Sequence, residues 1–171
     1  MKIMGKAVKA GAFALVLAAG PGAAQELLFD MGATLYCLDA AGSAGERQSC
    51  IGASANACMR ATDMGGTTVG MGGCIDRELG YWDDRLNASY RSLRAKNRAE
   101  DADFGSAPGY VNQADALRDM QRAWIAYRDA TCDYERAQWG GGTGGGPAML
   151  GCLMRLTGQQ AMYLERMMVE Y

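Results

Sequence analysis

The run LRDMQRAWIAYRDATCDYER, residues 117–136, constrains the fold more than any other stretch of the chain. Mostly apolar and aromatic side chains recur there every three or four residues, on one stripe of a helix: Leu117, Met120, Trp124, Tyr127, Thr131 and Tyr134. The run has no Gly or Pro and would form a helix about 30 Å long. Because a helix cannot bury such a stripe alone, we expect this segment to be the central helix of a domain, with its aromatic ridge buried.

Residues 1–24 have the layout of a secretory signal peptide. Three lysines come first, an apolar run from Ala10 to Ala19 follows, and small residues at 21–24 precede Gln25. The apolar run of about ten residues is too short to cross a bilayer, which needs roughly 20. We therefore expect cleavage near Ala24, no membrane anchor after it, and a periplasmic or secreted protein.

The chain beyond residue 24 is acidic. Three of the 17 Lys and Arg and none of the 19 Asp and Glu lie in residues 1–24, so 14 basic residues face 19 acidic ones, a net charge near −5. This balance argues against nucleic acid as a partner, because phosphate binding needs a concentrated basic face. It is compatible with a basic protein partner.

Six cysteines predict a disulfide framework, since an even number in an exported chain is typical of one. A metal site or a redox dithiol does not fit, because the chain has no C-x-x-C pair and no His. Predicted helical hairpins bring the thiols together in the pairs Cys37–Cys50, Cys58–Cys74 and Cys132–Cys152. Six cysteines also allow other connectivities.

The remaining pattern is helical throughout. We expect helices at 27–38, 46–62, 74–100 and 149–171 besides the central one, a Gly-rich loop at 64–73, a turn at 104–109 and a break at 140–147. The predicted fold is all-α, a disulfide-stapled helical bundle with three long helices and a short N-terminal helical hairpin. We divide it into an N-terminal disulfide-linked extension at 25–73 and a helical domain at 74–171.

The absence of His removes the Ser-His-Asp triad, the Cys-His pair and every His-ligated metal site. Carboxylates remain: Asp129 and Asp133 lie four residues apart on one helix, and Asp83 and Asp84 lie on another. A glycosidase needs two carboxylates facing each other across a cleft, but a solvated helix face has the same pattern. We expect no catalytic residue, no cofactor and no metal, and keep an unusual carboxylate glycosidase only as a third candidate.

Several polar residues are predicted to serve structure. Arg128 lies close to the apolar stripe, and a buried guanidinium needs a carboxylate partner, for which Asp83 is our candidate. Inward polar groups that fix helix register through hydrogen bonds are expected at Asn87, Gln121 and Thr157. The residues Gly141, Gly142 and Thr143 form either a candidate binding loop or a flexible connection.

Many of these residues occur in the order seen in one known family: Glu78, Trp82, Asp83, Leu86, Asn87, Tyr90, Gln121, Arg122, Trp124, Tyr127, Arg128, Asp129, Cys132, Gly141, Gly142, Thr143, Cys152, Leu156 and Thr157. The chain resembles the LprI-type lysozyme-inhibitor-like family of small exported helical domains. The resemblance covers about residues 74–170, and the run QRAW-x-x-YRD-x-x-C at 121–132 is its most specific part. The family pattern carries an Arg at Gln160, and the lipoprotein cysteine of the name-giving member is absent here.

The resemblance implies a non-enzymatic protein that binds lysozyme, a strongly basic enzyme, and gives the motif residues a packing role. An acidic domain suits such a partner because opposite charge speeds encounter. We therefore expect an exported lysozyme-inhibitor-like protein that acts on muramidases in the periplasm. The alternative is a general cell-envelope interaction module without inhibitory activity, which would bind another envelope protein.

Overall fold

The computed structural model describes residues 26–170, so the predicted signal peptide lies outside the described residues. This part of the chain forms six helices: α1 (Gly32–Ala40), α2 (Ala44–Ser49), α3 (Ala53–Ala61), α4 (Thr68–Phe104), α5 (Gln113–Ala137) and α6 (Gly145–Glu170). The predicted all-α bundle is confirmed. None of the helices described is both long and apolar enough to span a bilayer.

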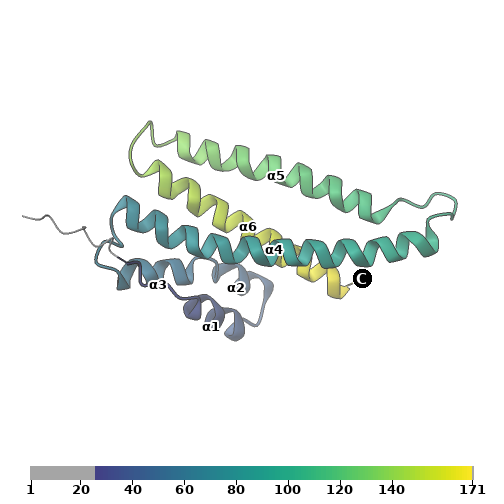
Figure 1. Ribbon diagram of the computed structural model, residues 1–171, viewed down its shortest axis with the longest axis horizontal. Helices are drawn as coiled ribbons and strands as arrows, with labels where there is room; N and C mark the ends of the chain where they lie inside the picture. The colour runs from purple at the N-terminus through teal and green to yellow at the C-terminus, as the bar shows by residue number, and fades with distance from the viewer. Residues whose placement is uncertain (1–25, 171) are drawn as a thin grey trace, which may run out of the picture.

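Helix α4, and not the predicted segment at 117–136, is the central helix of the molecule. It runs the length of the bundle in Figure 1, with α5 along one side and α1–α3 along the other. Helix α4 packs most extensively against α6, while α5 packs against α6 and α4. The prediction of a central helix at 117–136 is therefore wrong, and that segment is an outer helix.

The three disulfides join the pairs expected from the sequence. Cys37 in α1 bonds to Cys50 after α2, Cys58 in α3 bonds to Cys74 in α4, and Cys132 in α5 bonds to Cys152 in α6. The bonded residues are 13, 16 and 20 positions apart, so each bridge contributes about 3 kcal/mol in the chain-entropy model. The bridges staple the short N-terminal helices to each other and to α4, and α5 to α6.

The helix expected at 27–38 begins only at Gly32, so the prediction is wrong for residues 27–31. Helix boundaries also differ from the sequence expectation at three other glycine-containing segments. The helix expected at 46–62 is broken between α2 and α3, where Gly52 has a φ of 96°, a conformation that favours glycine. The loop expected at 64–73 is wrong for residues 68–73, because Thr67 caps α4 by accepting from the Gly70 amide at 3.0 Å. The domain boundary expected after residue 73 thus falls within α4. Helix α6 begins at Gly145 and contains Pro147 in its first turn, where proline is tolerated.

The carboxylate of Glu78 lies fully buried beside the start of α3. Its Oε1 accepts hydrogen bonds from the amide of Gly52 at 2.8 Å, the hydroxyl of Thr34 at 2.9 Å and the indole of Trp82 at 3.1 Å. Its Oε2 accepts from the amide of Ala55 at 2.7 Å. Helix N-termini favour anions because their first amides have no partner within the helix. Glu78 therefore locks α1 and α3 onto α4.

The aromatic ridge of α5 turns from the core into solvent along the helix. Leu117 is buried, Met120 and Trp124 are half-buried, and Tyr127 and Tyr134 are 61% and 67% exposed. The ridge repeats every seven residues, and such a repeat drifts by about 20° per heptad around a straight helix. The prediction of a buried seam is therefore wrong for its C-terminal half, where the buried residue is Cys132.

Candidate functional site: the groove between α4 and α5

The side chains that carry the family resemblance do not all enter the core. Eight of them line an open groove between α4 and α5: Asp83, Leu86, Asn87, Tyr90, Gln121, Arg122, Trp124 and Arg128. The groove has a volume of about 440 Å³, which is within the range of small-molecule sites. Residues to which the sequence analysis assigns packing roles thus share one surface.

Helix α4 supplies one wall through Asp83, Asn87, Tyr90 and Arg94, which follow one another at steps of four, three and four residues on one stripe. The amide nitrogen of Asn87 donates to Asp83 Oδ2 at 2.8 Å. Asn87 is thus half-exposed and bonded along its own helix, contrary to the expected inward hydrogen bond. Its amide oxygen and the Asp83 carboxylate give this part of the groove acceptors for hydroxyl groups.

Helix α5 supplies the opposite wall, on which Arg128 covers Trp124. The guanidinium of Arg128 lies 5.1 Å from the Trp124 ring centroid, and its Nη2 bonds to Asp129 Oδ1 at 2.8 Å. The predicted ion pair between Arg128 and Asp83 is not formed among the described residues. The groove separates the two helices here, and the adjacent Asp129 offers Arg128 a nearer partner.

Two other polar residues point inward as predicted. Gln121 is buried and accepts a hydrogen bond from Gln160 Nε2 at 3.1 Å, which joins α5 to α6 at the inner side of the groove. Thr157 is fully buried on α6, but its hydroxyl has no hydrogen-bond partner in the described structure. The hydrogen bond expected to fix helix register is therefore present at Gln121 and absent at Thr157.

Four guanidinium groups and one carboxylate line the groove. Arg118 is paired with Asp115 and Asp119, and its hydrogen bond lowers the pKa of the Asp119 carboxyl. Arg122 reaches only to 3.9 Å from an Asp119 oxygen, and its side chain is 73% exposed. Arg94 has no ion pair within the described residues, and its Nε is buried without a hydrogen-bond partner. The cations toward the α4–α5 connection are therefore incompletely neutralised.

The sequence analysis did not single out Arg94 or Arg118. The signal for Arg94 is present in the sequence, because it continues the stripe of Asp83, Asn87 and Tyr90 by one further step of four residues. Arg118 has no comparable signal, since it lies off the apolar stripe among other charged residues. Its place in the groove follows only from the way α5 is turned toward α4.

The remaining motif residues lie elsewhere. Glu78 and Trp82 are fully buried under α3. Gly141 and Gly142 line a separate hollow with Asp133 and Arg136 at the α5–α6 connection, where Thr143 is also exposed. A binding role for this loop stays a prediction.

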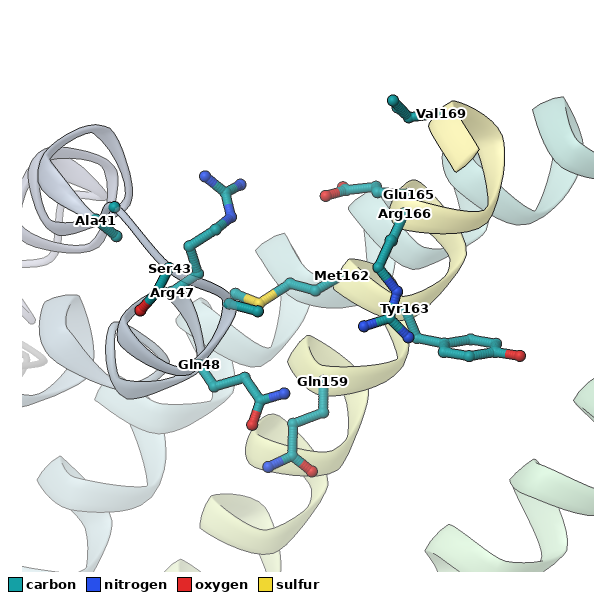
Figure 2. A pocket seen from close by; sticks show the side chains of 12 residues that line it. Ala41, Ser43, Arg47, Gln48, Gln159, Met162, Tyr163, Glu165, Arg166 and Val169 are labelled. Atoms are coloured by element: carbon teal, nitrogen blue, oxygen red, sulfur yellow. The ribbon is translucent and has the colours of Figure 1, made fainter. Parts of the chain in front are cut away.

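A second hollow, between α2 and the end of α6, has a volume of about 490 Å³. Figure 2 shows Met162 extending from α6 toward α2 in this hollow. Of its charged groups, Glu165 bonds to Arg85 at 2.5 Å, Arg166 lies over the ring of Tyr163, and Arg47 donates to the carbonyl oxygen of Leu38 at 3.4 Å. The α4–α5 groove differs in having cations without such partners.

The groove does not have the donor set of a glycosidase or of a metal site. Asp83 is its only carboxylate, and a guanidinium-rich wall faces it, whereas glycoside hydrolysis needs two opposed carboxylates. The pairs Asp83–Asp84 and Asp129–Asp133 lie exposed on helix surfaces. No three His, Cys, Asp or Glu side chains between residues 26 and 170 gather as a metal site would require.

Comparison with known proteins identifies relatives along most of the described chain. A family model described as "Lysozyme inhibitor LprI" matches residues 58–164. An uncharacterized protein of Rhizobium meliloti (strain 1021) is 33% identical over 96 residues, which are 56% of this chain and 69% of that protein. An uncharacterized 17.7 kDa protein of Rhodobacter capsulatus is 27% identical over 134 residues, 77% of this chain and 82% of that protein. No solved structure matches significantly.

Proposed function

The chain belongs to the LprI family of lysozyme inhibitors, and from this membership we propose that it is an exported, non-enzymatic protein that binds and inhibits lysozyme-type muramidases. The match over residues 58–164 is the observation that carries the proposal. Export to the periplasm or beyond is supported by the predicted signal peptide and by three disulfides, which persist in oxidising compartments.

The outer face of α5 is the surface best suited to a protein partner. We define this face by Ala123, Tyr127, Ala130 and Tyr134, all of which are exposed. Exposed tyrosines are frequent anchors of protein interfaces, because they bury a large area and lose little side-chain entropy. The alanines between them let a partner approach the helix closely.

Charge favours a basic partner at this face. Asp119 lies one turn before Ala123, Asp133 directly precedes Tyr134, and both are exposed. Hydrogen bonding from Arg118 lowers the pKa of Asp119, so its carboxylate is charged at neutral pH. Lysozyme is basic, and opposite charges at an interface raise the association rate.

The test adds the mature protein, residues 25–171, to a purified lysozyme and follows the turbidity of a cell-wall suspension. We expect excess protein to slow lysis, because the enzyme becomes occupied. The double substitution Tyr127→Ala with Tyr134→Ala is expected to weaken inhibition roughly tenfold or more. Undiminished lysis at a large molar excess of protein would end the proposal.

A matched control is Tyr36→Ala, since Tyr36 is 79% exposed on α1, away from α5. It should leave inhibition unchanged. Asp119→Asn with Asp133→Asn is expected to slow association at low salt and to have little effect at high salt, because salt screens exposed charges. Binding of the enzyme without any effect on lysis would instead favour an envelope interaction module.

A further inference from the structure

We propose that the groove between α4 and α5 binds a carboxylate-bearing sugar. The proposal does not depend on lysozyme inhibition, because it uses a different side of α5 from the outer face. It rests on the groups that line the groove: hydrogen-bond acceptors at Asp83 and Asn87, the ring of Tyr90 beside them, and three guanidinium groups toward the α4–α5 connection, while the fourth, Arg128, is paired with Asp129.

The carboxylate is assigned to the Arg94 end of the groove. Arg94 lines the groove without an ion pair among the described residues, and Arg122 approaches Asp119 only to 3.9 Å. A carboxylate placed between these side chains would accept from both, and guanidinium–carboxylate hydrogen bonds are among the strongest in proteins. No carboxylate of the described chain fills this role for Arg94.

The sugar ring is assigned to the middle and the Asp83 end. Asp83 and the carbonyl oxygen of Asn87 accept hydrogen bonds, which suits ring hydroxyl groups, because hydroxyls donate. Tyr90 is half-buried in the groove and offers aromatic surface to the apolar face of a ring, whereas Trp124 is covered by the guanidinium of Arg128 at 5.1 Å. Helix α4 rises about 16 Å between Asp83 and Arg94, which leaves room for one or two sugar residues.

A peptide carboxylate fits this arrangement less well. The backbone N–H groups of a peptide could donate only one or two hydrogen bonds to Asp83 and Asn87. A peptide also lacks the several hydroxyl donors of a sugar ring. The test therefore includes a peptide arm, in which tight binding would count against the proposal.

The experiment is a calorimetric titration of the mature protein with three probes. N-acetylmuramic acid and N-acetylglucosamine share one ring and differ by a lactyl ether that carries the carboxylate. N-acetyl-alanyl-alanine presents a carboxylate without a sugar. We expect N-acetylmuramic acid to bind about tenfold more tightly than either of the other two, because only it engages both ends of the groove.

The substitution Arg94→Gln is expected to lower the affinity for N-acetylmuramic acid to that for N-acetylglucosamine. The affinity for N-acetylglucosamine should stay unchanged. The control is Arg77→Gln, because Arg77 is exposed on α4 and does not line the groove. It should change neither affinity. Equal affinity for the two sugars, absence of binding at millimolar concentration, or tighter binding of the peptide would each overturn the proposal.

Discussion

Two stripes of helix α4 have different surroundings: one is buried, and the other lines a groove that is open to solvent. Glu78 and Trp82 lie on the first stripe and are fully buried; they bond to each other, and Glu78 also accepts from α1, from α3 and from Gly52 before α3. Asp83 and Asn87 lie on the second stripe, which is next to the first on the helix surface. They line an open groove in which not every guanidinium group has a carboxylate partner. Both stripes carry residues of the same family motif.

The difference shows that residues of one motif lie in two different environments, and we propose that they serve two purposes. A buried polar group must be fully hydrogen-bonded, because an unpaired one costs about 1–3 kcal/mol, so the Glu78 stripe specifies how the N-terminal helices dock. A groove open to water has no such requirement, so its polar groups can remain available to a ligand. We expect substitutions on the first stripe to affect stability and substitutions on the second to affect binding.

The largest effect is expected from Glu78→Ala. It would leave the Gly52 and Ala55 amides, the Thr34 hydroxyl and the Trp82 indole without their acceptor, so we expect a loss of about 3–5 kcal/mol in the free energy of unfolding. Glu78→Gln keeps the shape and one acceptor, and should lose about 1–3 kcal/mol. Urea unfolding followed by circular dichroism measures both values.

The matched control for Glu78 is Asp83→Ala, on the same helix but exposed. It should change the free energy of unfolding by no more than about 0.5 kcal/mol. Equal losses in the free energy of unfolding for Glu78→Ala and Asp83→Ala would contradict the difference between the two stripes.

A smaller effect is expected from Gly158→Ala in α6, opposite Trp82. The added methyl group would lie 2.8 Å from Ile51 Cδ1 and 3.1 Å from Trp82 Cδ2, so overpacking should cost about 1–3 kcal/mol. Gly151→Ala, in the same helix, would meet no atom within 4 Å. It should instead stabilise the protein by up to about 1 kcal/mol, because alanine favours helix.

Thermal unfolding compares the stabilities of the two glycine variants, neither of which removes a hydrogen bond. It therefore tests the packing around the buried stripe alone. A Gly158→Ala protein as stable as Gly151→Ala would mean that α6 and Ile51 move apart easily around Trp82. The buried stripe would then be less tightly packed than the structure indicates.

The smallest effect is expected at Asp101, near the groove end of α4. Burial raises the pKa of its carboxyl, whereas hydrogen bonds from the Ala114 and Gln113 amides and the Tyr110 hydroxyl lower it. The hydrogen bonds outweigh burial, so the pKa lies below its ordinary value. Because the pKa is lower in the folded protein than in the unfolded chain, these bonds stabilise the fold at neutral pH. That contribution is lost as the pH falls through the folded-state pKa.

Asp101→Asn should therefore be less stable than the wild-type protein at pH 7, and the difference should shrink toward pH 3. Urea unfolding at a series of pH values measures it. Asp103→Asn is the control, since Asp103 is exposed and makes no hydrogen bond within the described residues. A difference for Asp101→Asn that does not vary with pH would show that the hydrogen bonds do not depend on the charge.

Much of the fold was predictable from local sequence. The helical periods and the disulfide pairs of neighbouring helices depend on residues close together in the chain, so spacing is sufficient to infer them. The glycine-rich segments were less informative, because residues 68–73 are part of α4. Gln121 was recognisable as an inward polar group for the same reason, since it lies beside Leu117 and Trp124 on one helical turn.

The candidate site was not predictable in the same way, because it depends on how whole helices are turned toward one another. Periodicity places Trp124 and Tyr127 on one stripe, but only the packing of α5 against α4 and α6 leaves Tyr127 exposed and Trp124 in a groove. Likewise, only one of the four donors to Glu78, the Trp82 indole, is local. The other three lie 23 to 44 residues away, in α1, α3 and the segment before α3, so the sequence near Glu78 does not mark it as buried. Local interactions decide which segments are helices, whereas the free energy of burial, shared among distant segments, decides which face of each helix meets water.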